Sequence, residues 1–211
     1  MIQALEGGLF EELTYLYIDD TTKHGFVIDP GMDAERLAKY VKEQGITIEK
    51  ILITHGHLDH IRGATALRAL LDAPIVIHKE GKLYLEDPNW NLSVGIFNEP
   101  LVMTADIYVE HGDEIALKAN ADFKVRVIHA PGHTTDGVAY YSEKDGVIFV
   151  GDIIFEGSVG RSDLPGGDAM RLLSAIRAQI FTLPDETVIF PGHGNQTTVK
   201  KERETSPVFN F

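Results

Sequence analysis

Short apolar runs alternate along the chain with segments of helical spacing. In the first half, the apolar runs predict strands at residues 13–18, 26–28, 50–54 and 73–77, and the helical spacing predicts helices at 33–44 and 64–71. In the second half, strands are expected at 114–117, 123–129, 138–141, 147–150 and 187–190, and helices at 168–181 and 198–204. Asp33 and Asp168 can cap two of these helices, and Gly45 can end the first. The order of elements predicts two packed sheets with helices outside them.

Residues 81–105 break this regularity. The segment contains Pro88, Trp90 and Pro100 and has neither period. A segment of this kind often forms a lid or a substrate wall beside a site, and the alternative is a surface excursion without a role. The whole length of 211 residues suits one α/β domain, which we expect to span residues 1–211.

Composition narrows the classes of function. The chain has no cysteine, so any metal would be held by nitrogen and oxygen atoms. Its formal charge of −13 would repel nucleic-acid backbones, which argues against a nucleic-acid partner. Its sequence has neither an apolar stretch long enough to cross a membrane nor a basic, apolar leader. We therefore expect a cytoplasmic protein without a membrane partner.

The candidate chemistry begins directly after the strand predicted at 50–54. His55, His57, Asp59 and His60 follow one another within six residues, with Gly56 between the first two. Residues two apart in an extended segment point the same way, so His55 and His57 can bind one ion. Asp59 and His60 would lie where the next helix begins and could face a second ion. The alternative, a solvated loop of histidines, fits this dense pattern poorly.

Three later segments place a similar residue at the end of an apolar strand, next to glycine. They end in Gly132-His133, Gly151-Asp152 and Gly192-His193. Each would be a plain turn if it stood alone. Four such strand ends in one chain predict that the strands converge on a shared metal site.

Together these residues resemble the metallo-β-lactamase superfamily, in which an H-x-H-x-D-H core is followed by a later His, Asp and His. The resemblance covers residues 25–195 and implies an α/β fold (α+β in some classifications), a four-layer αββα sandwich with metals at one edge of the sheets. Within the superfamily the chain looks most like the glyoxalase II group, the hydroxyacylglutathione hydrolases. Residues 157–168 are similar to small single-domain bacterial members of that group.

The resemblance also implies a ligand set for two divalent ions, with zinc as the first choice and iron or manganese as alternatives. It assigns His55, His57 and His133 to one ion, and Asp59, His60 and His193 to the other, with Asp152 bridging them. A hydroxide shared by the two metals can attack a thioester, ester or lactone carbonyl. Asp59 is the candidate catalytic residue, because its carboxylate can also orient that nucleophile.

The resemblance implies a small acyl-thiol substrate, with S-D-lactoylglutathione as the example. Larger glyoxalase II enzymes bind glutathione through a C-terminal helical domain, whereas only a short tail follows His193 here, so the thiol carrier is left open. One rival is a mono-iron oxidoreductase related to the persulfide dioxygenases. Another is an ester, lactone or β-lactam hydrolase of the same superfamily, and a third is a metal-stabilised binding protein. Homo-oligomerisation is left open.

Four further residues are candidates for supporting roles. Arg161 and Tyr108 are candidate substrate contacts, although Arg161 could instead pair with Asp163 and Tyr108 could serve packing. Asp29 ends a strand, where the resemblance implies that it supports the metal loop, and the alternative is a simple turn. Asp163 is expected to help shape the loop beside the site.

Overall fold

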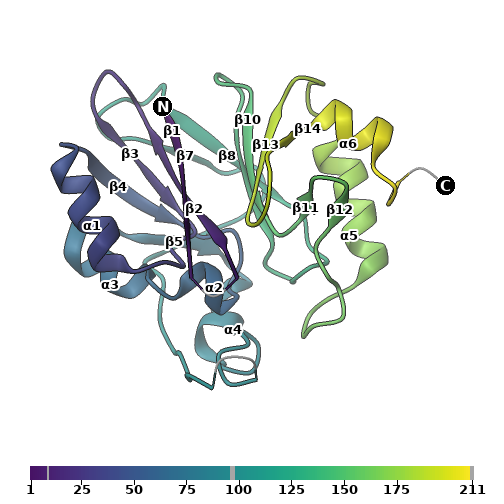
Figure 1. Cartoon of the computed structure of the whole chain (residues 1–211), viewed down its shortest axis with the longest axis horizontal. Helices are drawn as coiled ribbons and strands as arrows, with labels where there is room; N and C mark the ends of the chain where they lie inside the picture. Colours follow the sequence, from purple (N-terminus) through teal and green to yellow (C-terminus); the bar gives the residue numbers. More distant parts are fainter. Residues whose placement is uncertain (9, 96–97, 210–211) are drawn as a thin grey trace.

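Two six-stranded sheets form the centre of the computed structural model, which describes residues 1–8, 10–95 and 98–209 (Figure 1). The first sheet has six strands in sequence order: β1 (Ile2–Gly7), β2 (Glu12–Ile18), β3 (His24–Ile28), β4 (Thr47–Leu52), β5 (Ile75–His78) and β6 (Ile107–Val109). The second sheet has this order: β14 (Thr197–Thr198), β13 (Val188–Pro191), β10 (Val147–Gly151), β9 (Val138–Ser142), β8 (Lys124–His129) and β7 (Glu114–Ala116). A separate small hairpin consists of β11 (Ile154–Phe155) and β12 (Ser158–Val159).

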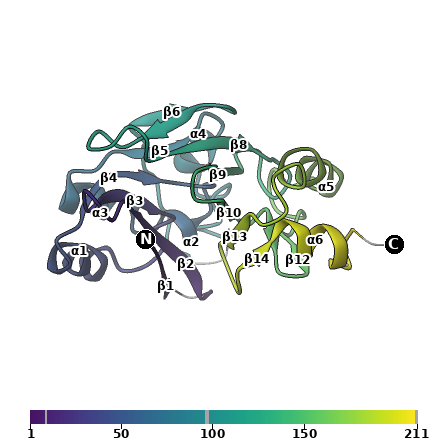
Figure 2. The ribbon, with the colours of Figure 1, turned by 90° about the horizontal axis from the view of Figure 1, so that it is seen from above.

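Helices cover the outer faces of both sheets (Figure 2). Helices α1 (Ala34–Glu43) and α3 (Ala64–Leu71) pack on the first sheet, where they share an apolar core with it. The second sheet is covered by α5 (Ala169–Ala175), its π-helical continuation Ile176–Ile180, and α6 (Val199–Thr205). Two further short helices are α2 (Leu58–Ile61) and α4 (Gly81–Glu86). The architecture is the expected αββα sandwich.

Strand β2 shows how one sequence run serves two cores. Successive side chains of a strand point to opposite faces of the sheet. Tyr15 and Tyr17 therefore enter the core between the two sheets, while Leu16 and Ile18 pack beneath the helices. A strand buried on both faces reads as a continuous apolar run, which is why the sequence predicted these strands well.

The helix boundaries predicted from capping residues are confirmed. The Asp33 carboxylate accepts the backbone N–H groups of Glu35 and Arg36 at 2.9 and 3.0 Å. Helix α1 ends just before Gly45, which has a φ of +65°. The Asp168 carboxylate caps α5 in the same way.

Several segments differ from the prediction. Strand β6 and the short strands β11, β12 and β14 were not predicted. Strand β1 was not predicted, because it pairs only with β2 and its exposed edge carries polar residues. Strand β4 ends at Leu52 rather than at Thr54, whose N–H binds the Asp29 carboxylate instead of a neighbouring strand. The irregular segment 81–105 contains α4, and its residues 96 and 97 lie outside the described part of the chain.

The topology brings several strand ends to one edge of the sandwich. Strands β3, β4 and β5 run parallel to one another in the first sheet, as do β10 and β13 in the second. Parallel strands present their carboxyl ends at the same edge, where sites of open α/β sheets commonly lie. Across the described residues, no helix has the length and apolar character needed to cross a membrane.

Candidate metal centre

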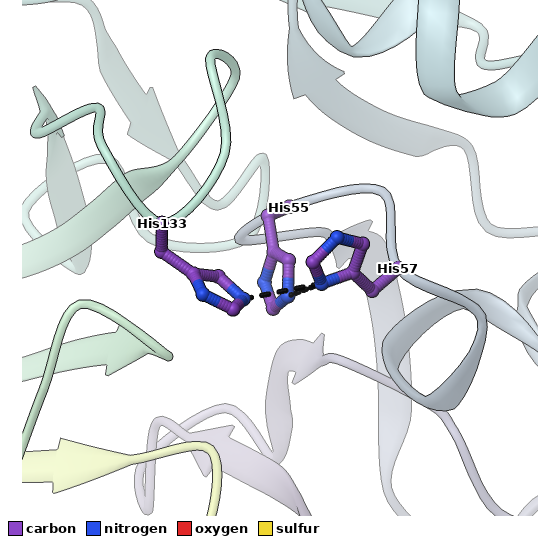
Figure 3. A group of neighbouring side chains, drawn as sticks. All are labelled: His55, His57 and His133. Carbon is purple, nitrogen blue, oxygen red and sulfur yellow. Dashed lines mark hydrogen bonds between the residues drawn. The ribbon is translucent and has the colours of Figure 1, made fainter. Parts of the chain in front are cut away.

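Three imidazoles converge at this edge (Figure 3). His55 and His57 lie in the turn that follows β4, and His133 lies in the loop that follows β8. The Nδ1 atom of His57 lies 3.1 Å from the Nε2 atom of His55 and 3.1 Å from that of His133. All three rings are buried. Their nitrogen atoms therefore surround one point, as ligands of a single ion would.

A second group lies beside the first. Asp59 and His60 belong to α2, and His193 follows β13. The Asp59 Oδ2 atom lies 3.4 Å from His193 Nε2 and 3.7 Å from His60 Nε2. The ligand atoms of these three residues all lie within 4.8 Å of one another.

Asp152 faces both groups. Its Oδ1 atom lies 3.4 Å from His60 Nε2, and its Oδ2 atom lies 3.7 Å from the Nε2 atoms of His133 and His193. The residue follows β10, the strand next to β13, so the sheet itself places it between the two groups. The structure thus brings together all seven residues predicted to bind metal.

Hydrogen bonds to the far ring nitrogens set the tautomers of four histidines. A carbonyl oxygen can only accept, so His133 Nδ1 donates to Arg161 O at 2.7 Å and His193 Nδ1 donates to Phe10 O at 2.9 Å. His60 Nδ1 lies 3.0 Å from an Asp29 carboxylate oxygen. The Thr54 hydroxyl donates to Asp29 and can therefore accept from His55 Nδ1. In its neutral form, each of these rings therefore presents an unprotonated Nε2 to the site, which is the form that binds a metal.

The site contains buried polar atoms that a cation would satisfy. Within the described residues, His60 Nε2 and Asp152 Oδ1 are buried and have no hydrogen-bond partner. Leaving such atoms unpaired costs free energy unless an ion or water binds them. Imidazole nitrogens and carboxylate oxygens without sulfur suit zinc, iron or manganese. The residues present therefore fit a metal centre.

Burial and the surrounding charges shift the pKa values of these side chains in different directions. Burial and the neighbouring imidazoles lower the pKa of His55 well below its usual value, and burial with His133 lowers the pKa of His57 to about 3. Burial opposes protonation of His60 as well, but the carboxylates of Asp59 and Asp152 outweigh it and raise the pKa of His60. Despite burial, the adjacent histidines lower the pKa of both carboxyl groups. The carboxylates are therefore charged at neutral pH.

Asp29 contacts the loop that carries the candidate metal ligands. Its carboxylate accepts the N–H of Thr54 at 2.7 Å and the Thr54 hydroxyl at 2.6 Å, and it also contacts His60. The residue is buried and has a φ of +50°. These contacts are those expected of the supporting role rather than of a simple turn.

Two contributors to the site were not identified from the sequence. The buried carboxylate of Asp136 accepts the N–H of Gly56 at 2.9 Å and so fixes the turn between His55 and His57. The ring of Tyr84, on α4, lies edge-on to His57 with ring centres 6.0 Å apart. An acidic residue three positions after His133 was a usable signal, whereas nothing in the sequence distinguished Tyr84 from a core tyrosine.

A pocket of about 380 Å³ opens beside the metal-binding atoms. Ten residues line it: Phe10, His57, Asp59, Leu92, His133, Asp152, Phe155, Arg161, Leu164 and His193. Arg161 is thus at the site as predicted, and its guanidinium also pairs with Asp163. The Asp163 carboxylate binds Arg161 rather than a metal-binding residue. Tyr108 lies on β6 beside a different hollow, with Lys50, so the structure does not bring it to this pocket.

The family model of the metallo-β-lactamase superfamily matches residues 7–193 of this chain. The chain belongs to the metallo-β-lactamase superfamily. Among curated superfamily members, the hydroxyacylglutathione hydrolase GloC of Haemophilus influenzae is 32% identical over 211 residues, which cover 99% of this chain and 98% of that protein. The relationship therefore extends over nearly the full length of both proteins.

Solved structures of the superfamily agree in fold. The B3 metallo-β-lactamase BLEG-1 has a TM-score of 0.94 and 34% identity, with both chains covered completely. The di-iron-bound form of TTHA1623 has a TM-score of 0.85 and 31% identity, covering 98% of this chain and 99% of the other. ETHE1 from Myxococcus xanthus has a TM-score of 0.80 and 28% identity, covering 98% of this chain and 83% of the other. Membership of this superfamily and the histidine-rich site support metal binding and a hydrolase.

Proposed function

We propose that this protein is a metal-dependent hydrolase that cleaves a thioester, such as S-D-lactoylglutathione, into a carboxylic acid and a thiol. The observation that carries the proposal is the position of Asp152, whose two carboxylate oxygens face the two groups of candidate ligands. Two divalent ions held there would lower the pKa of a shared water and supply hydroxide as the nucleophile. The similarity to GloC, which is a hydroxyacylglutathione hydrolase, supports the choice of a thioester.

Each group of residues has a distinct part in this proposal. His55, His57 and His133 would hold one ion, and Asp59, His60 and His193 the other, with Asp152 shared. The metals would be zinc, with iron or manganese as alternatives. The di-iron-bound form of the similar protein TTHA1623 supports iron as an alternative.

Asp59 is the proposed catalytic residue. Its carboxylate lines the pocket and lies beside His193. Because the adjacent histidines lower its pKa in spite of burial, it is ionised at neutral pH and can accept a hydrogen bond. A carboxylate at this place can orient the attacking oxygen toward a carbonyl carbon in the pocket.

The similarity to ETHE1 favours one alternative, a mono-iron oxidoreductase of the persulfide dioxygenase type. Such an enzyme would need only the first group of ligands. The close approach of Asp59, His60 and His193 supports a second ion and hence the hydrolase. Hydrolysis of another ester, a lactone or a β-lactam would use the same centre and differs only in the substrate.

Metal analysis paired with two activity assays tests the proposal. We expect about two metal ions per chain and turnover of S-D-lactoylglutathione that is lost on chelation and restored by metal. One iron per chain, together with oxygen uptake in the presence of glutathione persulfide, would instead establish the oxidoreductase. The variant Asp152→Ala should lose the second ion, whereas Asp72→Ala, an exposed carboxylate at the end of α3, should keep both.

A further inference from the structure

Apolar side chains form the walls of the pocket beside the metal-binding atoms. Phe10, Leu92, Phe155 and Leu164 line it, and the polar atoms of the lining come mainly from the candidate metal ligands themselves. The four apolar residues come from four separate segments, which are the turn before β2, the segment after α4, strand β11, and the loop after β12. The Phe155 ring also packs edge-on to His193, with ring centres 6.2 Å apart. The space next to the reacting carbonyl is therefore suited to an apolar group.

Leu92 lines this wall in a backbone conformation that leucine disfavours. Its φ is +67°, a region that residues other than glycine rarely adopt and that is retained mainly where the surroundings impose it. The fully buried side chain of Asn91 imposes it, because Nδ2 donates to Tyr84 O and Leu101 O at 2.9 and 3.0 Å. The Asn91 carbonyl in turn accepts the N–H of Leu58 at 2.9 Å, at the start of the helix that carries Asp59. Leu92 is thus fixed relative to the metal centre.

The pocket offers little to an anionic carrier. Among the described residues that line the pocket, Arg161 is the one arginine or lysine. Its guanidinium donates two hydrogen bonds of 2.8 Å to the Asp163 carboxylate, so its charge is already paired. The chain as a whole carries a formal charge of −13. A thiol carrier with two carboxylates, such as glutathione, would therefore meet no unpaired arginine or lysine in the described lining.

We propose that the preferred substrates are thioesters with an apolar acyl group on an uncharged thiol carrier, an inference that rests on the thioester hydrolysis proposed above. The oxygen of water forms a bond to the acyl carbon, the carbon–sulfur bond breaks, and the departing sulfur takes a proton. The products are a carboxylic acid and a neutral thiol. Leu92, Phe155 and Leu164 select the acyl group, because burying it removes apolar surface from water.

The expected ratio of kcat/KM between a longer and a shorter acyl group follows from the free energy of apolar burial. Burial of one methylene group increases binding by about fourfold. A butanoyl group, with two methylenes more than acetyl, should therefore raise kcat/KM by about fifteenfold when both are carried by N-acetylcysteamine. For the same butanoyl group, the N-acetylcysteamine thioester should be hydrolysed with a higher kcat/KM than the glutathione thioester.

The experiment uses the metal-loaded protein and these three thioesters, with S-D-lactoylglutathione as a fourth. Leu92→Gly removes the side chain and relieves the backbone conformation, so it should reduce the butanoyl-to-acetyl ratio to about three or less. Phe155→Ala should reduce it in the same direction, which guards against a folding defect in the first variant. Val102→Ala, an exposed residue in the same segment as Leu92, is the matched control and should keep the ratio.

The outcomes separate the two proposals. Equal kcat/KM for the acetyl and butanoyl thioesters, or a higher kcat/KM for butanoylglutathione than for its N-acetylcysteamine counterpart, would overturn this inference while leaving the hydrolase intact. A ratio unchanged by both Leu92→Gly and Phe155→Ala would also overturn it. Failure to hydrolyse any of the four thioesters with two metals bound would overturn the proposed function itself.

Discussion

The hydroxyl of Tyr84 accepts the backbone N–H of Thr135 at 2.9 Å. This bond joins α4 to the loop that carries His133. The same hydroxyl donates to Pro165 O at 3.3 Å, in the loop that contributes Leu164 to the pocket. One side chain thus connects a metal-binding loop with a wall of the pocket.

Tyr84→Phe should therefore lower both stability and substrate binding. The ring stays, but the partly buried Thr135 N–H loses its acceptor, which costs about 1–3 kcal/mol in the free energy of unfolding. Urea denaturation measures that loss, and a rise in KM larger than any fall in kcat would show that the pocket wall has moved. Tyr40→Phe removes a hydroxyl that bonds Gln3 in a less buried place and should cost less than half as much. An equal loss in the free energy of unfolding for the two variants would show that the hydrogen bond to Thr135 contributes no more than the one to Gln3.

Asp29→Asn should weaken metal binding. The carboxylate orients His60 directly and His55 through Thr54, and removal of such a partner commonly reduces metal affinity by about 10–100-fold. Competition with a chromogenic chelator measures the affinity. Asp33→Asn is the control, because Asp33 caps α1 and asparagine caps a helix as well. An affinity equal to that of the wild type would refute the supporting role of Asp29.

Asp136 should make stability depend on pH. Burial, with a further contribution from the charge of Glu80, raises the pKa of Asp136 to about 7 from an ordinary value of 3.8. The folded state therefore holds its proton more tightly than the unfolded state. The stability that this proton contributes is present below the ordinary pKa and is lost as the pH rises through about 7.

Asp136→Asn removes that dependence. Between pH 5 and pH 8, the free energy of unfolding of the variant should rise relative to that of the wild type by about 2–3 kcal/mol. Denaturation of both metal-free proteins at the two pH values measures the difference, and the titration of the metal ligands cancels in the comparison. The exposed Asp72→Asn controls for the loss of one charge. A difference that stays constant across this range would contradict the prediction.

Metal removal should destabilise the protein. Without a cation, the charges of Asp59 and Asp152 repel each other, and the buried nitrogen of His60 has no partner in the described structure. An ion present at 100 times its dissociation constant stabilises the folded state by about 2.7 kcal/mol. Thermal unfolding before and after chelation should show a lower melting temperature that is recovered on adding zinc. An unchanged melting temperature after complete metal loss would contradict the proposed centre.

The sequence predicted most of the layers because its strands are buried on both faces. Runs such as those of β10 and β13 are apolar throughout, and the caps at Asp33 and Asp168 mark their helices locally. Strand β1 was missed for the opposite reason. It is an edge strand with one exposed face, and its place in the sheet depends on pairing with β2 rather than on its own apolar content.

The sequence by itself determined which residues are available to bind metal, since the dense His55–His60 motif and three strand-terminal glycine turns name all seven. Only the tertiary structure decided how they are supported and what lies beside them. Asp136 reaches Gly56 from 80 positions away, Tyr84 reaches Thr135 across 51, and Leu92 enters the pocket through the contacts of Asn91. A motif is local because neighbouring residues share one turn of backbone. Hydrogen bonds between distant segments and the walls of a pocket arise only when the sheets pack.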